Sequence, residues 1–151
     1  MQIIDDYAAI DEIVNLWRRC GLLRPWNDPI NDITLARADN GAVLCALLDN
    51  KLIGAAMVGH DGHRGAVYYF GVDPEYQKTG VGRALMNACE DWVRARNIPK
   101  INLLVRKENQ GVLDFYQGLG FEDTNSICLY KNLNPEQAKI EKLQKANWRK
   151  D

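Results

Sequence analysis

The most constraining feature of the sequence is the stretch FGVDPEYQKTGVGR at residues 70–83. A run rich in aromatic and β-branched residues, 66–72, is typical of a strand, and a helical periodicity follows the glycines as far as about residue 97. The first N–H groups of a helix have no intrahelical partners, and the helix dipole is positive at that end. Gly80 and Gly82 have no Cβ to cover those N–H groups. The sequence therefore predicts an anion site, suited to phosphate, where the strand leads into the helix.

Two common phosphate-binding motifs do not fit this stretch. A P-loop requires Gly-x-x-x-x-Gly-Lys-Ser/Thr, but residues 78–79 follow Gln77, and Val72 stands at the first glycine position. The dinucleotide-binding fingerprint requires a third glycine, which is missing after residues 80–82. The stretch therefore binds a different phosphate compound, or it is a glycine-rich turn without a ligand.

The pattern along the rest of the chain predicts a mixed α/β fold. The chain has 151 residues, of which 46% are apolar and 26% are charged, as in an ordinary globular domain. Hairpins followed by strand–helix–strand–helix–strand indicate a mixed sheet rather than a barrel or a doubly wound fold. Residues 134–151 are expected to form a solvated helical tail outside a domain at 1–133. The pattern predicts four helices: at about 7–21, from 32 to about 41, from the glycines at 80–82 to about 97, and from 109 to about 120. It predicts strands at 2–4, 42–48, 51–59, 66–72, 100–106 and 126–133.

Charge and composition argue against several classes of partner. The net charge of -1 gives no general attraction to nucleic acid or to a membrane surface, and no apolar run has membrane-spanning length. Acidic residues near the start, where a signal peptide would be basic, favour a cytoplasmic protein. His60 and His63 share a predicted turn without a third ligand, so no metal is expected. The cysteines lack a C-x-x-C motif and lie in apolar surroundings, which predicts buried free thiols at Cys20, Cys45, Cys89 and Cys128.

Two blocks of the sequence resemble one known family. The pattern Val-Asp-Pro-x-Tyr-Gln-x-x-Gly-x-Gly-Arg-x-Leu at 72–85 resembles the coenzyme A signature of the GNAT superfamily of N-acetyltransferases. The block NQGVLDFYQGLGF at 109–121 resembles the later motif of that family, in matching order and spacing. Within the superfamily, RPWNDP and DGHRGAVYYFGV are similar to bacterial YpeA-type acetyltransferases. The resemblance covers about residues 1–133. It implies a mostly antiparallel sheet that splays between two central parallel strands, at 66–72 and 100–106, and is flanked by about four helices.

The same resemblance implies an acetyl-CoA-dependent N-acetyltransferase, in which the acetyl group passes directly to a primary amine in a ternary complex. Loop N–H groups would hold the pyrophosphate, and backbone groups of the strand before the loop would hold the pantetheine arm. Tyr116 would give a proton to the leaving thiolate, and Asn109 would contact the arm. The alternatives are a helix N-cap for Asn109 and a packing role for Tyr116. The implied coenzyme residues are Phe70, Gly71, Val72, Gln77, Lys78, Thr79, Gly80, Val81, Gly82, Arg83, Asn109 and Tyr116.

The acceptor side and the general base are less well marked. Relatives that acetylate ribosomal-protein N-termini carry a glutamate where this chain has Leu104, which argues against that substrate and removes the obvious base. The expected acceptor-binding residues are Trp26, Asn27, Asp28, Asp61 and Tyr69, although Trp26 could instead pack its loop. The candidate bases are Asp28, Asp61, His63, Tyr69 or a water relay.

Two other functions compete with catalysis. A non-catalytic acyl-CoA-binding module would keep the glycine loop, and the missing glutamate at Leu104 favours it, whereas Tyr116 counts against it. An interaction domain working through the lysine-rich tail is disfavoured, because the sequence offers no basic surface interleaved with aromatic residues. The sequence does not name the amine, and it leaves the oligomeric state open, with a homodimer as one candidate.

Overall fold

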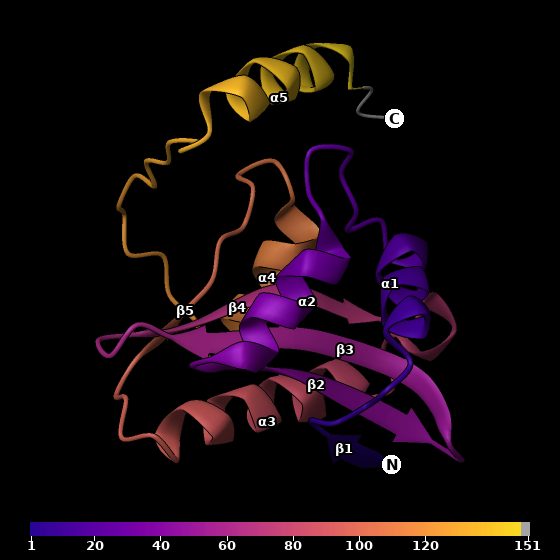
Figure 1. Cartoon of the computed structure of the whole chain (residues 1–151). Coiled ribbons are helices and arrows are strands. Elements are labelled where there is room, and N and C mark those ends of the chain that lie inside the picture. Colours follow the sequence, from indigo (N-terminus) through magenta and orange to yellow (C-terminus); the bar gives the residue numbers. More distant parts are fainter. Residues whose placement is uncertain (149–151) are drawn as a thin grey trace. The chain divides into compact units, whose positions relative to one another are not determined.

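The computed structural model describes residues 1–148 (Figure 1). By contacts, the chain divides into two compact units. The first unit contains Met1–Leu23 and Pro29–Arg106, and the second contains Arg24–Asp28 and the chain from Lys107 onward. The elements of the first unit are β1 (Gln2–Ile4), α1 (Ile10–Arg19), α2 (Pro29–Ala38), β2 (Gly41–Leu48), β3 (Lys51–His60), β4 (Gly65–Val72), the short 3-10 helix η1 (Pro74–Tyr76), α3 (Val81–Arg94) and β5 (Ile101–Asn102).

The five strands form one sheet in sequence order, β1-β2-β3-β4-β5. The first four pair antiparallel, and β4 pairs with β5 in parallel. Asp49 and Asn50 have φ values of 50° and 65°, the left-handed conformation that a two-residue hairpin turn requires. The predicted tight turn between β2 and β3 is therefore confirmed, as is the mixed, mostly antiparallel fold.

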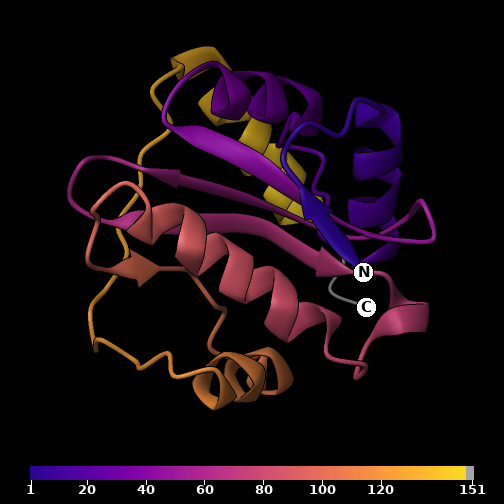
Figure 2. The same ribbon diagram turned by 90° about the horizontal axis from the view of Figure 1, so that it is seen from below.

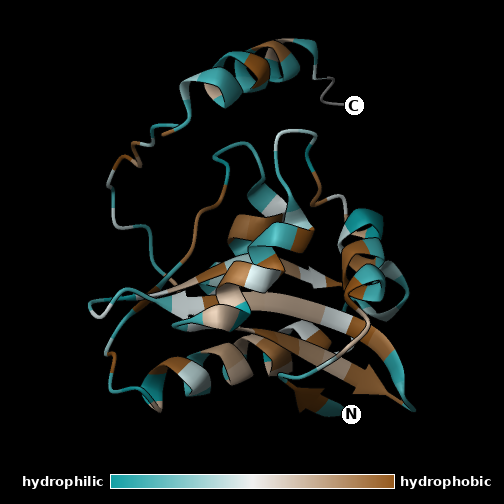
Figure 3. Cartoon of the chain, viewed as in Figure 1, coloured by the Kyte–Doolittle hydropathy of each residue, from teal (hydrophilic) through white to brown (hydrophobic). Residues whose placement is uncertain are grey.

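Helices cover both faces of the sheet in the first unit. Figure 2 shows α3 along one face, with α1 and α2 on the other. The apolar positions of α1 bury Ile13, Leu16 and Trp17 against β2 and β3, whose apolar colouring is clear in Figure 3. On the opposite face, Val81 of α3 packs with buried residues of β2 and β3. The core therefore lies on both sides of the sheet.

The last two predicted strands differ from the structure: the first is confirmed only in part, and the second is wrong. Strand β5 contains only Ile101–Asn102 of the predicted 100–106, and residues 126–133 form no strand. In that segment Ile127 and Leu129 are 85% and 88% exposed. Their alternating pattern resembles a strand, but a strand also needs a partner for its backbone groups. Without a strand there, the parallel pair lies at the edge of the sheet rather than at its centre.

The second unit contains α4 (Gln110–Gly118) and α5 (Pro135–Asn147). The side chain of Asn109 caps α4, and Gly120 follows its end with a φ of 96°. Asn134 caps α5, and Pro135 occupies its first position, where a missing N–H costs nothing. A helical tail was predicted and is observed; the domain boundary at residue 133 stays a prediction.

The buried-thiol prediction holds for two of the four cysteines. Cys45 and Cys89 are buried free thiols, and burial raises the pKa of each to about 12, so both stay protonated and unreactive. Cys20 is half-buried, and Cys128 is exposed, because its segment forms no strand. Within residues 1–148 no group of three or more metal-ligating side chains comes together, and no helix is long and apolar enough to cross a membrane.

Candidate functional site

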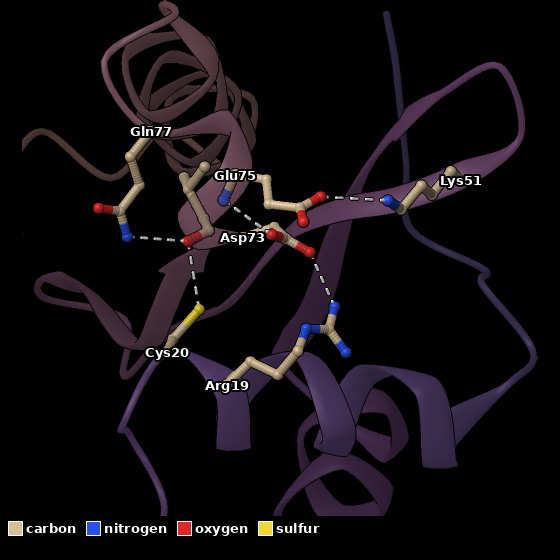
Figure 4. Close-up of polar contacts among 7 residues, drawn as sticks. Arg19, Cys20, Lys51, Asp73, Glu75 and Gln77 are labelled. Atoms are coloured by element: carbon tan, nitrogen blue, oxygen red, sulfur yellow. Dashed lines mark hydrogen bonds and ion pairs between the residues drawn. The ribbon is translucent and has the colours of Figure 1, made fainter.

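The loop between β4 and α3 is closed by hydrogen bonds to one carbonyl oxygen. The oxygen of Val72 accepts from Gln77 Nε2 at 3.1 Å and from Cys20 Sγ at 3.3 Å (Figure 4). Gln77, which was predicted to contact the coenzyme, thus also ties the loop back to the end of β4. The hydroxyl of Thr79 donates to the Tyr76 carbonyl within the loop. The loop conformation is therefore held by its own side chains together with Cys20 at the end of α1.

Asp73 anchors the start of the loop. It is 5% exposed, and its carboxylate accepts from the Glu75 N–H at 3.0 Å and from Arg19 Nη2 at 2.9 Å. Burial alone would raise the pKa of this carboxyl, but the Glu75 N–H and the Arg19 guanidinium outweigh burial, so its pKa lies below the ordinary 3.8. Asp73 therefore joins α1 to the loop as an ionised group.

Asp73→Ala is expected to lower the free energy of unfolding at pH 7 by about 1–2 kcal/mol, because the Glu75 N–H loses its capping acceptor and Arg19 loses its charged partner. A folded pKa below 3.8 means that ionised Asp73 stabilises the fold above that pH, and that this contribution is lost as the pH falls through the folded value. In urea unfolding, the difference in the free energy of unfolding between Asp73→Ala and wild type should be smaller at pH 3 than at pH 7. Asp91→Ala, which removes an exposed partner of Arg94, is the control. Equal effects of the two changes would contradict the anchoring role.

The start of α3 presents N–H groups to an anion. Gly80 precedes the helix with a φ of 90°, a left-handed conformation that glycine adopts without strain. The first hydrogen bond of the helix is donated by the Ala84 N–H to the Gly80 carbonyl at 3.1 Å. The N–H groups of residues 81–83 therefore come before the first intrahelical hydrogen bond. The first turn of α3 contains no acidic residue, while Lys78 and Arg83 are exposed there. This is the geometry and charge of a phosphate site.

Strand β4 is irregular where the coenzyme arm was expected. Ala55 pairs with Gly71 and Met57 with Tyr68, so residues 69–70 oppose one residue of β3 and form a bulge. Tyr69 has a φ of 52° at this bulge, a strained conformation for an aromatic residue. The ladder with β5 consists of two pairs, Gly65 with Ile101 and Ala66 with Asn102. Strand β5 ends after these two pairs, and β4 continues past it as far as Val72.

The side chain of Tyr69 is linked to a carboxylate that sequence reasoning missed. Its hydroxyl donates to Asp32 Oδ2 at 2.7 Å, and its ring stacks on Trp17 with 4.5 Å between the centroids. Asp32 belongs to α2 and lies 37 residues before Tyr69, so no local pattern signals the pair. The pair is held between α1, α2 and β4 in the first unit.

The other expected base candidates of the first unit serve local roles. Asp61 Oδ1 accepts from the N–H groups of Arg64 and His63, each at 2.8 Å, and these bonds lower the pKa of Asp61. This carboxylate shapes the turn between β3 and β4, and a lowered pKa makes it a weaker base. Leu104 follows β5 and is 61% exposed.

In the second unit, Asn109 and Tyr116 lie at the two ends of α4. Asn109 Oδ1 accepts from the Val112 N–H at 3.4 Å, so the capping alternative is observed. Tyr116 is 9% exposed, and its ring meets Phe115 and Phe121 edge-on at 5.2 and 5.8 Å between centroids. The packing alternative is thus also observed, and the coenzyme contacts of both residues stay predictions.

The expected acceptor residues Trp26, Asn27 and Asp28 lie together on a cavity of about 190 Å³ in the second unit. Its other lining residues, which sequence reasoning missed, are Pro25, Asn132, Gln137, Ile140, Glu141 and Gln144. The tail residues among them share one helical face, so their spacing was the signal that could have grouped them. The structure does not place Asp61 or Tyr69 on this cavity.

Comparison with known proteins identifies similar chains. The profile of the acetyltransferase (GNAT) family matches residues 10–121. An acetyltransferase of Sodalis glossinidius is 44% identical over 126 residues, which cover 83% of this chain and 87% of that protein. An acetyltransferase of Pectobacterium atrosepticum is 42% identical over 130 residues, or 85% of this chain and 90% of that protein.

Two solved structures share the fold at lower identity. One is AAC(6')-Iy in complex with a bisubstrate analogue, CoA-S-monomethyl-acetylneamine, with 21% identity and a TM-score of 0.74 over 87% of this chain and 97% of that one. The other is an aminoglycoside acetyltransferase from an uncultured soil metagenomic sample, in complex with sisomicin. It has 18% identity and a TM-score of 0.74 over 88% of this chain and 95% of that one.

Proposed function

Since this chain belongs to the GNAT family of acetyltransferases, we propose that it moves an acetyl group from acetyl-CoA to a primary amine by direct transfer in a ternary complex. One observation carries the proposal. The β4–α3 loop ends in left-handed Gly80 and leads into a helix start with exposed basic residues and no acidic one in its first turn. That arrangement suits the pyrophosphate of coenzyme A, whose charge meets the positive end of the helix dipole.

The remaining coenzyme groups are assigned to β4 and α4. In this proposal the pantetheine arm bonds to the backbone of Phe70 and Val72, where β4 continues past the end of β5 and carries a bulge, which disrupts the regular ladder. One of those N–H groups polarises the thioester carbonyl. Asn109 contacts the arm with the part of its amide that the N-cap does not use.

The chemistry consists of one displacement at the carbonyl carbon. The neutral amine attacks, the C–N bond forms, and the C–S bond breaks with its electron pair going to sulfur. Tyr116 gives a proton to the thiolate, and the proton lost by the amine passes to a carboxylate. We assign this second role to Asp28, a candidate base that lies on the same cavity as Trp26 and Asn27.

A small-molecule amine is the supported class of acceptor. One solved neighbour is named an aminoglycoside acetyltransferase and is in complex with sisomicin, and the other is in complex with the bisubstrate analogue CoA-S-monomethyl-acetylneamine. The non-catalytic alternative is not favoured, because the curated relatives at 42–44% identity are named acetyltransferases.

A thiol-release assay with acetyl-CoA and a panel of amines tests the proposal. We expect CoA release that depends on the added amine, together with a mass-spectrometric product that is the acetylated amine. Hydrolysis without an amine is the background control. Acetyl-CoA binding by calorimetry without release for any amine would instead support a non-catalytic acyl-CoA-binding module.

A further inference from the structure

The cavity of about 190 Å³ in the second unit lies between one face of α5 and the segment 25–28. The lining side chains of α5 follow the spacing i, i+3, i+4 and i+7, which places them on a single helix face. Gln144 Nε2 also donates to the Pro25 carbonyl at 3.5 Å, which joins the helix to the segment. The tail helix therefore forms one wall of the cavity, and the other wall carries the predicted acceptor residues.

The lining of the cavity is polar and acidic. Asp28 and Glu141 supply carboxylates, and Trp26 supplies an indole ring. Among the residues that the structure describes, no lysine or arginine lines the cavity. Carboxylates and amide oxygens accept hydrogen bonds from ammonium and hydroxyl groups, and an acidic wall disfavours anions. The side-chain amides of the lining belong to Asn27, Asn132, Gln137 and Gln144.

Glu141 is held as an oriented, ionised group. Its carboxylate accepts from Lys145 Nζ and Asn132 Nδ2, each at 2.7 Å, and from Tyr130 Oη at 3.0 Å. The Lys145 ammonium, with Asn132 and Tyr130, lowers the pKa of Glu141 below its ordinary 4.5. Lys145 also lies 5.5 Å from the centroid of the Trp26 ring. The ammonium of Lys145 thus already lies over this ring and pairs with Glu141, and Asp28 supplies the second carboxylate of the lining.

We propose that this cavity binds the amine acceptor, that the α5 side chains Gln137 and Gln144 select it, and that the acceptor is a hydroxylated primary amine. The inference rests on the proposed acetyltransferase function. The volume corresponds to about six water molecules and lies below the range of drug-sized sites. It therefore holds one amine-bearing ring or short chain rather than a larger molecule. The amides pair with hydroxyl groups, while the Asp28 carboxylate attracts the ammonium.

The test uses opposite charge changes at Gln137, with glucosamine as the probe. Gln137→Lys should raise the KM for glucosamine about two- to fivefold, and Gln137→Glu should lower it by a similar factor, since the wall becomes less or more acidic. The KM for acetyl-CoA should stay unchanged in both variants. The backbone N–H of Gln137 bonds to the capping Asn134, so side-chain changes leave the cap intact. Lys139→Glu, on the same helix but outside the lining, is the matched control.

Opposite shifts in the KM for glucosamine distinguish a role of Gln137 in acceptor binding from a role in packing. A packing defect would instead raise the KM in both Gln137 variants. Wild-type enzyme should also prefer glucosamine to cyclohexylamine, an amine-bearing ring without hydroxyl groups. Shifts at Gln137 that match those of Lys139→Glu, or a preference for cyclohexylamine, would overturn the inference while acetyl transfer stands. Absence of transfer to every amine would overturn the proposed function itself.

Discussion

Tyr116→Phe is expected to lower kcat by about 10²-fold while acetyl-CoA binding stays within twofold of wild type. The change removes one hydroxyl and keeps the ring, so the edge-on contacts with Phe115 and Phe121 are preserved. The expected loss is that of a positioned proton donor, since the leaving thiolate would have to take its proton from water. Steady-state rates with saturating substrates measure kcat, and calorimetry measures coenzyme affinity.

The matched control for this prediction is Tyr7→Phe. Tyr7 bonds through its hydroxyl to Glu12 at the start of α1, and that hydrogen bond is the first cause of its raised pKa, about 12. Removing this hydroxyl should leave kcat unchanged. Wild-type turnover in the Tyr116 variant would show that Tyr116 only packs between its aromatic neighbours.

Gly82→Val is expected to weaken acetyl-CoA binding about 10- to 100-fold, because a branched side chain then shields N–H groups that would bond to a charged phosphate. Gly82 lies inside α3 and is not among the glycines with positive φ, and valine is a better helix former than glycine. The backbone of α3 therefore favours the change. Gly80 is less suitable, because its φ of 90° would strain any side chain.

Lys78→Ala is the control for the loop prediction. Lys78 is exposed and already has a φ of 61°, so alanine keeps the same backbone demand and removes only a solvated charge. Such a charge is worth at most about 1 kcal/mol, or fivefold in affinity. Calorimetry at one salt concentration, with melting curves for both variants, makes the comparison. Equal losses for the two changes would mean that the phosphate is held by charge and not by the N–H groups.

The elements that the sequence predicted well depend on near neighbours. The turn at Asp49 and Asn50, the cap at Asn109 and the glycine at position 80 each act within a few residues of the chain, as do the apolar faces of α1 and α3. The glycine loop at the start of a helix belongs to this class. For that reason the candidate anion site could be located, and its family motif read, without a structure.

Features that join distant residues were missed or misjudged. The pairs Arg19 with Asp73 and Tyr69 with Asp32 span 54 and 37 residues, and the bulge in β4 depends on the register with β3. The segment 126–133 alternates like a strand, yet an alternating pattern does not specify whether a partner strand exists.

By itself the sequence determined the local structures: turns, caps, amphipathic faces and the glycine loop, because side chains and backbone preferences within a few residues decide them. Only the tertiary structure decided which of these structures meet. It turned residues 69–70 into a bulge, ended the parallel pairing after two residue pairs, and grouped residues 25–28 with the tail helix around one cavity. Those outcomes depend on packing and hydrogen bonding between segments that are far apart in the chain. The total free energy of such contacts cannot be derived from any local sequence pattern.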